Sequence, residues 1–336
     1  MIVLPMLVVA LSSCEKAKQA VEAARAKISG TKDPGAPVTP GGEVSADLAA
    51  QVDTAAEGVR FRRDLKFPSK LNVRLVERHT FKNARVMSSS ELGAETATID
   101  GTWEMVGLVA RDGGQVSLQI EKAGKVVDVE EVAKNAGGAS NPPAASNVSP
   151  SAGSQPAGSK LTFIHTKKGW QGKRGAGPVD FRNMLWEKSL LPSLSRILST
   201  NGLSPRTQWF SSSKRWIGGD EVVLSGDAIA LLFPGKGNSG KVTLVYEAAE
   251  ALDSHPCGRF SVKGAVSTKN EVGVDGVKRD SEVSITSGKI WCSLIYPVVM
   301  REEYESVVTT VEGSGSGPKV RIQGGVDSIT SRSWKP

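Results

Sequence analysis

Long apolar segments and fibrous repeats are absent from this sequence of 336 residues. No run of 18 apolar residues occurs, which argues against a transmembrane helix, because such a helix needs about 20 of them. No heptad pattern or collagen-like period occurs either, which argues against a fibre. Glycine and proline are frequent by contrast, with 36 and 17 residues, and 39% of the chain is hydrophobic. This composition is typical of a soluble, turn-rich globular protein with one large or two small domains.

Residues that carry catalytic or metal chemistry are scarce. There are only three histidines and three cysteines, and metal sites need such residues in clusters. His255, Cys257 and Cys292 offer three zinc ligands in principle, but their spacing matches no standard site. No G-x-S-x-G motif marks a serine nucleophile, and no pair of carboxylates stands out. We therefore expect no catalytic residue, no metal, no cofactor and no enzyme activity.

The segment Gly235–Lys241 matches the G-x-x-x-x-G-K pattern of a phosphate-binding loop. That chemistry needs a Ser or Thr at the next position and a following helix, whose N-terminus holds the phosphate. Val242 takes the next position, and the residues after Lys241 alternate in polarity as those of a strand do. The segment is therefore predicted to be a glycine-rich hairpin loop.

The first 14 residues carry the strongest motif of the chain. Residues 1–13 are almost wholly apolar, with a length that suits the central region of a secretory signal, and they end in Leu11-Ser12-Ser13-Cys14. This arrangement resembles the lipobox of bacterial lipoproteins. The resemblance implies diacylation of the Cys14 thiol, cleavage before Cys14 and acylation of the new amino terminus. No Lys or Arg precedes the apolar run, although a secretory signal normally begins with one, so a true start upstream of Met1 is one explanation. A buried N-terminal strand or helix with an incidental cysteine is the alternative to the lipobox.

Two acyl chains give a stable membrane anchor, so the resemblance implies a lipid-anchored protein of the cell envelope. Glu15, rather than Asp, follows Cys14, which favours the outer membrane, with the protein facing the periplasm. Cys257 and Cys292 then remain as a pair that an oxidising periplasm would join in a disulfide. Closing that loop of about 36 residues would contribute roughly 4 kcal/mol to stability. Two buried thiols are the alternative.

The mature chain is predicted to begin with a tether over residues 14–57. It combines helix formers at 15–28, a Gly/Pro segment at 30–42 and a short helix at 45–56, capped by Ser45 or Asp47. Residues 58–135 form a first β section. The polar stretch 136–159 is either an interdomain linker or a long loop. Residues 160–336, a helix and a β-meander, are expected to form one domain with 58–135.

Period-two alternation predicts many short antiparallel strands, and a period near 3.6 predicts one amphipathic helix at about 180–200, broken near Pro192. The expected fold is mainly β: a curved antiparallel sheet, as a half-barrel or a sandwich, with that helix packed on it. The predicted strands are 71–76, 97–110, 115–121, 160–166, 205–210, 221–226, 228–233, 241–247, 258–267, 278–287, 289–299, 305–312, 318–325 and 328–334.

The order of these elements, together with the lipobox, is similar to that of the lipoprotein-carrier proteins of the LolA/LolB type. In that family a half-barrel and its helix enclose a hydrophobic cavity for acyl chains, so the resemblance implies a lipid-binding role. The ligand contacts would then include Met184, Leu185 and Leu191 of the helix. Trp170 lies in a basic, glycine-rich segment and is predicted to belong to a contact loop.

The net charge is +7, and basic residues gather between Arg60 and Arg78. Aromatic residues make up only 5% of the chain, and few interleave with this basic cluster, so base stacking and nucleic-acid binding are not expected. Anionic lipid or an acidic cell-wall polymer is the expected partner, and a solvated basic face is the alternative. Most of the seven tryptophans are predicted to be core anchors.

The function expected from these features is that of a membrane-anchored, non-enzymatic lipoprotein. It would bind an apolar or envelope ligand, or scaffold another envelope component. The first alternative is a β-sandwich that binds carbohydrate or protein, which a row of exposed tryptophans would favour. The second is a lipid-anchored hydrolase, which a converging Ser-His or carboxylate pair would favour.

Overall fold

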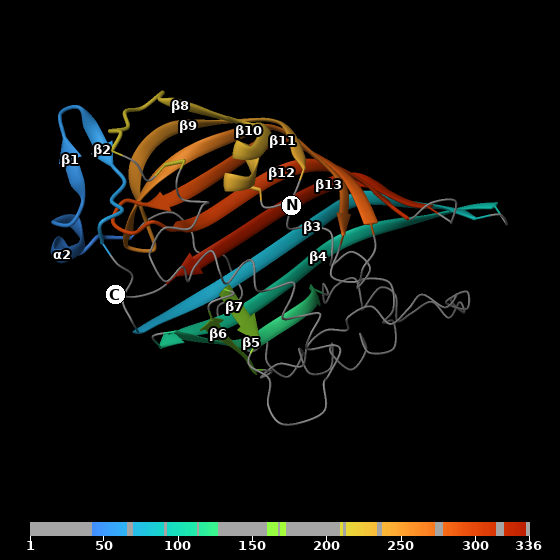
Figure 1. Ribbon diagram of the computed structural model, residues 1–336, viewed down its shortest axis with the longest axis horizontal. Helices are drawn as coiled ribbons and strands as arrows, with labels where there is room; N and C mark the ends of the chain where they lie inside the picture. The colour runs from blue at the N-terminus through green and yellow to red at the C-terminus, as the bar shows by residue number, and fades with distance from the viewer. Residues whose placement is uncertain are drawn as a thin grey trace, which may run out of the picture.

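The computed structural model describes residues 42–65, 70–90, 93–112, 114–126, 160–166, 169–172, 209–210, 213–233, 237–272, 278–313 and 319–333. Most of these residues belong to one antiparallel sheet of eleven strands, which curves strongly and stays open between its two edge strands (Figure 1). The predicted fold class, mainly β with a curved antiparallel sheet, is confirmed. The predicted helix at 180–200 lies outside the described residues.

The strands of the large sheet range from four to twenty-one residues. In chain order they are β3 Lys70–Ser90, β4 Gly93–Asp112, β5 Gln115–Val126, β6 Lys160–Thr166, β7 Gly169–Gly172, β8 Glu221–Ser225, β9 Asn238–Leu252, β10 His255–Val272, β11 Lys278–Ser293, β12 Val299–Glu312 and β13 Lys319–Ser333. Across the sheet the order is β7-β6-β5-β4-β3-β13-β12-β11-β10-β9-β8. A small hairpin, β1 Asp53–Ala55 and β2 Gly58–Arg60, stands apart from it.

One pairing joins the two β sections of the sequence. Strands β3 and β13 are distant in the chain but pair antiparallel from Ser89–Lys319 to Arg74–Ser333. Every other neighbouring pair in the sheet follows directly along the chain, as in a meander. The residues that the sequence divides into 58–135 and 160–336 therefore contribute to the same sheet.

Two predicted pairs of short strands are single long strands. Residues 278–287 and 289–299 were expected to be separate, but β11 runs through to Ser293, with a register shift between Ile285 and Ser287. Residues 318–325 and 328–334 are likewise one strand, β13, with a shift between Gln323 and Gly325. In each case a bulge lies near the expected turn, because an extra residue interrupts the ladder without ending the strand.

Two further predicted elements differ from the structure. Residues 228–233 are not a strand, because the 3-10 helix η3, Gly226–Leu231, covers most of them and buries Ile229. The helix predicted at 45–56 is reduced to α2, Ala46–Ala49, whose N-cap is Ser45. The hairpin β1–β2 follows it, since Arg60 and Arg215 both bind Asp53 and hold the chain in that turn. None of the described helices is long and apolar enough to span a membrane.

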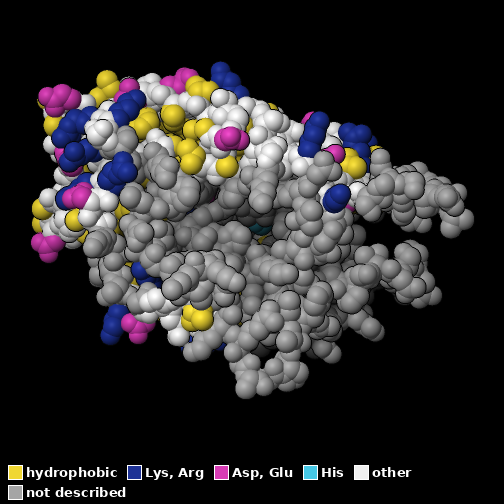
Figure 2. Space-filling view, in the orientation of Figure 1, with side chains coloured by type: hydrophobic (Ala, Val, Ile, Leu, Met, Phe, Trp, Pro, Cys, Tyr) yellow, Lys and Arg dark blue, Asp and Glu magenta, His cyan; other side chains and the backbone are white. Residues whose placement is uncertain are grey.

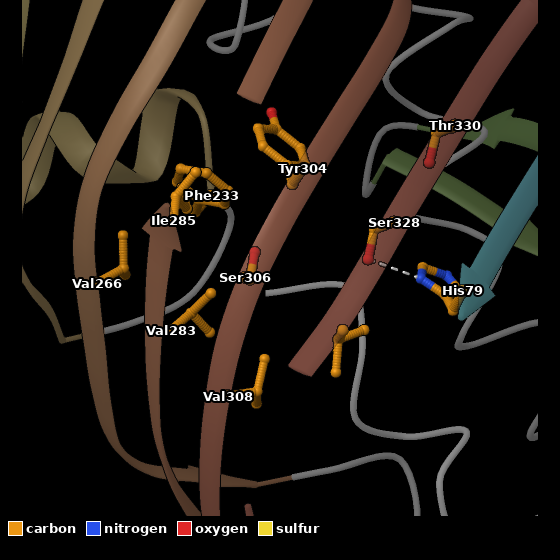
Figure 3. Close-up of a pocket in the computed structure, with 11 residues that line it drawn as sticks. His79, Phe233, Val266, Val283, Ile285, Tyr304, Ser306, Val308, Ser328 and Thr330 are labelled. Atoms are coloured by element: carbon orange, nitrogen blue, oxygen red, sulfur yellow. Dashed lines mark hydrogen bonds between the residues drawn. The ribbon is translucent and has the colours of Figure 1, made fainter. Parts of the chain in front are cut away.

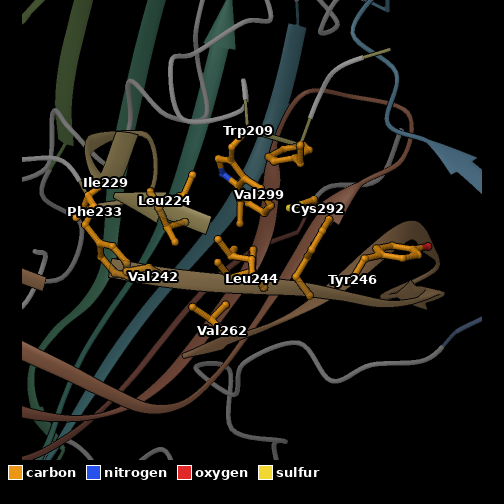
Figure 4. Packing of buried hydrophobic residues seen from close by; sticks show 14 of the residues in the cluster. Trp209, Leu224, Ile229, Phe233, Val242, Leu244, Tyr246, Val262, Cys292 and Val299 are labelled. Carbon is orange, nitrogen blue, oxygen red and sulfur yellow. The ribbon is translucent and has the colours of Figure 1, made fainter. Parts of the chain in front are cut away.

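The side of the sheet that carries η3 is called the inner face here, and the sheet bends around it (Figure 1). Alternate residues of every strand point to this side. At the β8–β11 end, the inner face is packed with aromatic rings whose centroids lie 4.8 to 6.3 Å apart. Figure 4 shows how this cluster joins Trp209 and Tyr246 to aliphatic residues of β8, β9 and β10. The aromatic members are Phe61, Trp209, Phe210, Trp216, Phe233, Tyr246 and Phe260.

Candidate functional site

Polar side chains enter the inner face where β3, β13 and β12 lie side by side. The residues of the three strands stand in register, so each row across the sheet has one member from each strand. The rows change from mainly apolar to hydroxyl-rich to charged along the strands. They are Phe81–Val326–Ser306, then His79–Ser328–Tyr304, then Glu77–Thr330–Glu302, and Arg332 opposite Leu75 comes next. We call the seven residues Glu77, His79, Glu302, Tyr304, Ser328, Thr330 and Arg332 the inner polar cluster.

A cavity of about 40 Å³ lies beside this cluster (Figure 3). Its lining comes from β3, β10, β11, β12, β13 and the residue Phe233 that follows η3. Those strands lie side by side, so the lining extends over roughly 19 Å, at about 4.8 Å per strand. Apolar side chains form the side toward β10, and the hydroxyls of β13 with His79 form the other side. The apolar lining residues are Phe233, Val266, Val283, Ile285, Val308 and Val326.

His79 is the buried base of the cluster, with 3% of its surface exposed. Its Nδ1 lies 3.0 Å from the Ser328 hydroxyl, and its ring stacks on Trp103 at a centroid distance of 6.2 Å. Burial lowers the pKa of His79 to about 4, so the imidazole is neutral near pH 7. Within the described residues, its Nε2 is buried and has no hydrogen-bond partner.

Arg332 is the buried cation of the cluster, with 2% of its surface exposed. Its Nη1 donates to the Val299 carbonyl at 3.0 Å and to a Glu302 carboxylate oxygen at 3.4 Å. Burial lowers its pKa to about 10, while Glu77 and Tyr304 act in the opposite direction. Its Nε and Nη2 are buried with no hydrogen-bond partner among the described residues. The Tyr304 hydroxyl completes the network by donating to Glu302 at 3.0 Å.

Two Ser-His contacts bear on the hydrolase alternative. The His79–Ser328 pair uses Nδ1. Among the described residues no carboxylate binds the other ring nitrogen, Nε2, to orient the imidazole as a nucleophile pair requires. The second pair joins His255 Nε2 to Ser293 Oγ at 2.7 Å. Ser293 Oγ also accepts from the backbone amides of Ile295 and Tyr296, at 3.2 and 3.0 Å. This second pair therefore fixes the turn that follows β11.

The predicted disulfide between Cys257 and Cys292 is absent: neither cysteine forms one. Cys257 stands opposite Ser293, and Cys292 stands opposite Gly258. Because neighbouring residues of a strand point to opposite faces, the two thiols point to opposite sides of the sheet. Both are buried, and burial, helped by the charge of Glu250, raises the pKa of the Cys257 thiol well above its usual value. The alternative of two buried thiols is the one observed.

Within the described residues, no contact joins the other predicted contact residues to the inner polar cluster. Trp170 lies in the edge strand β7 and pairs with His165, but its side chain is outside the described part. Cys14, Met184, Leu185 and Leu191 also lie outside the described residues. The four described tryptophans with placed side chains, Trp103, Trp209, Trp216 and Trp291, are buried as core anchors.

Several basic residues between Arg60 and Arg78 form ion pairs with carboxylates. Ion pairs join Arg60 to Asp53, Arg62 to Asp64 and Arg74 to Glu121. Arg78 and Lys122 both bind Glu104 on the outer face. Figure 2 shows basic and acidic side chains intermixed at the end that carries β1 and β2. Within the described residues, no three His, Cys, Asp or Glu side chains are grouped closely enough to hold a metal ion.

Comparison with known proteins gives no family. No protein-family model matches the chain, and no curated protein matches it. Two solved structures align weakly. They are HCR/D-Sa-GBL1/C, at 7% identity and a TM-score of 0.14, and the botulinum neurotoxin serotype C1 binding domain, at 7% identity and a TM-score of 0.13. The alignments cover 83% of this chain and 86% of the first structure, and 79% of both chains for the second. Scores this low carry no argument about fold or function.

Proposed function

We propose that the protein is a lipid-anchored, non-enzymatic binding protein that takes up an alkyl segment of an amphipathic ligand on the inner face of its sheet. The observation that carries this proposal is the apolar cavity beside a buried polar cluster. Binding sites for small molecules are typically concave and apolar, with a few placed polar groups. A cavity of about 40 Å³ has room for more than one water-sized group, since one such group needs roughly 10–15 Å³ of cavity space, and this suits a short alkyl segment.

The sequence supplies the support for the anchor. An apolar run that ends in Leu11-Ser12-Ser13-Cys14 is the pattern of a lipoprotein signal, and acylated Cys14 would hold the domain at an outer membrane, facing the periplasm. The residues that precede α2 would then separate the sheet from the membrane, since α2 and the hairpin β1–β2 pack on the domain. A ligand drawn from the envelope, a lipid or a cell-wall polymer with an apolar group, suits that location.

The two alternatives have less support. A carbohydrate-binding surface would present exposed tryptophans, whereas Trp103, Trp209, Trp216 and Trp291 are all buried. A hydrolase would need a basic histidine beside its serine, and the pKa of His79, at about 4, makes it a weak base near pH 7. We therefore propose binding without catalysis.

A matched pair of variants tests the proposal. Val308 lines the cavity, whereas its neighbour Val307 points to the outer face and is 45% exposed. We expect Val308→Phe to fill the cavity and to weaken binding of 1-decanol at least tenfold in isothermal titration calorimetry. Val307→Phe, which adds the same atoms outside, should bind as the parent chain does. No heat of binding from the parent chain, or equal binding by both variants, would remove the basis of the proposal.

Lipidation is tested separately, on protein extracted in mild detergent from its own host. Intact mass spectrometry should give a chain that starts at Cys14 and carries the mass of two or three acyl groups. A Cys14→Ser variant should lack them and leave the membrane fraction. An unmodified chain that starts at Met1 would overturn the anchor while leaving the cavity proposal in place.

A further inference from the structure

One complete edge of the Arg332 guanidinium has no hydrogen-bond partner among the described residues. The Nε–H and one Nη2–H point in the same direction, and this edge is the part of an arginine that binds two acceptor lone pairs side by side. Both nitrogens are buried and unbonded within the described residues, whereas Nη1 already serves Val299 and Glu302. A buried donor without an acceptor destabilises a fold, so such an edge suits an acceptor supplied by a ligand.

Arg332 lies on the strand that forms part of the cavity wall. Arg332 and Thr330 are two residues apart on β13 and share the inner face, so they are separated by about 7 Å along the strand. Thr330 lines the cavity together with Ser328 and His79. A molecule whose alkyl segment fills the cavity would thus bring an atom a few bonds further along its chain to Arg332.

The charges around Arg332 decide what kind of acceptor fits. Glu302 lies 3.4 Å from its Nη1, and Glu77 is close enough to influence its pKa. The cluster therefore holds two carboxylates and one cation, and its histidine is neutral near pH 7 because the His79 pKa is about 4. A ligand carboxylate would add a third negative charge to a buried site with a single positive one, which is unfavourable in a medium of low polarity. An alcohol or ester oxygen adds no charge and still accepts hydrogen bonds.

We propose that the head group bound at the Nε–Nη2 edge of Arg332 is an uncharged oxygen acceptor, an alcohol or an ester, and that the site rejects fatty-acid anions. This inference rests on the proposed function and names the class of its ligand. His79 Nε2, which is buried without a hydrogen-bond partner among the described residues, offers a second neutral hydrogen-bonding atom for such a head group.

Two ligands of equal chain length test the selectivity. Isothermal titration calorimetry at pH 7.5 compares 1-decanol with decanoate on the full chain, and we expect decanol to bind at least tenfold more tightly. Glu302→Gln removes one negative charge and keeps an acceptor for Tyr304. This variant should shift the ratio of decanoate affinity to decanol affinity about tenfold in favour of decanoate.

A second variant tests the edge itself. Arg332→Lys keeps the positive charge but has no paired donors, so decanol binding should weaken about tenfold while near-UV circular dichroism stays that of the parent. Equal binding of decanol and decanoate by the parent chain would overturn the inference and leave the proposed function standing. Tighter binding of decanoate would do the same. Absence of binding by both ligands would overturn the proposed function, and the inference with it.

Discussion

The two ends of the inner face are built in different ways. At the β8–β11 end, Phe260 has four aromatic neighbours at centroid distances of 5.0 to 5.5 Å, and none of its surface is exposed. At the β3–β13–β12 end, the inner polar cluster buries two carboxylates, a guanidinium and an imidazole. The aromatic end gains stability from area removed from water and from edge-to-face ring contacts. The polar end must offset the desolvation of its charges through hydrogen bonds that it only partly makes.

This difference separates stability from function. A cluster of rings with few polar atoms needs no ligand to be satisfied. A buried guanidinium with an open edge, beside a cavity, is costly to the folded chain, and costly arrangements concentrate at functional sites. The contrast predicts that changes at the aromatic end lower stability without altering selectivity, and that changes at the polar end alter both.

The largest expected effect is at the aromatic end. Phe260→Ala removes a fully buried ring from the cluster, and we expect the free energy of unfolding to fall by about 3–5 kcal/mol. Urea denaturation followed by tryptophan fluorescence measures this change. Val223→Ala, on the edge strand β8 at a site that is 40% exposed, is the control and should change stability by less than about 0.5 kcal/mol. A Phe260→Ala loss below about 1 kcal/mol would contradict the packing described for this end.

The second effect tests the polar end. Arg332→Met leaves Glu302 buried without its cation, and breaking a buried pair in this way costs roughly 3 kcal/mol. Adding Glu302→Leu should recover 1 kcal/mol or more of that loss, by the same principle, because the stranded charge is then removed. Denaturant unfolding of the single and double variants gives both numbers. If the double variant is less stable than Arg332→Met, the charge of Glu302 is not what the single variant strands.

The sequence predicted one of these ends better than the other. The alternation of apolar residues in β9, β10 and β11 marks a buried face and predicts the β class, and the short turns between the strands predict their antiparallel order. The inner polar cluster escaped detection because its members lie on β3, β12 and β13, up to 255 residues apart from Glu77 to Arg332. Only the pairing of β3 with β13 brings them together. A local signal exists, since Arg332 occupies the same face of its strand as Val326, but the predicted break between 318–325 and 328–334 hid that periodicity.

The third effect concerns pH. Burial lowers the pKa of His79 and of His255 to about 4, whereas both titrate near 6.5 when unfolded. The unfolded chain then binds more protons between these values, so stability is full above about pH 6.5 and is lost as the pH falls toward 4. Each histidine contributes up to roughly 1.4 kcal/mol per pH unit in that window. The Asp64 carboxylate, whose pKa Arg62 holds at about 2, acts only at lower pH.

His79→Gln measures how much of this pH dependence of stability comes from the polar end. The variant has no titratable group at position 79, so its stability should fall about half as steeply between pH 6.5 and 4.5 as that of the parent. Urea midpoints at pH 7.5, 6.5, 5.5 and 4.5 provide the slopes. Equal slopes in the two chains would mean that His79 titrates alike in the folded and unfolded states, and would remove the argument that it is neutral and desolvated.

The smallest expected effect concerns Cys257 and Cys292, which lie on the neighbouring strands β10 and β11. The cysteine count suggested a disulfide, but residue identity alone does not say which face of a strand each thiol occupies, and a shift of one position reverses it. With the thiols on opposite sides of the sheet, a reductant has no bond to break, and it should change the free energy of unfolding by less than about 0.5 kcal/mol. Protein kept in an oxidising buffer is then unfolded in urea with iodoacetamide and without reductant. Both cysteines should be alkylated. If both react only after reduction, the register of β10 against β11 must differ from Cys257 opposite Ser293.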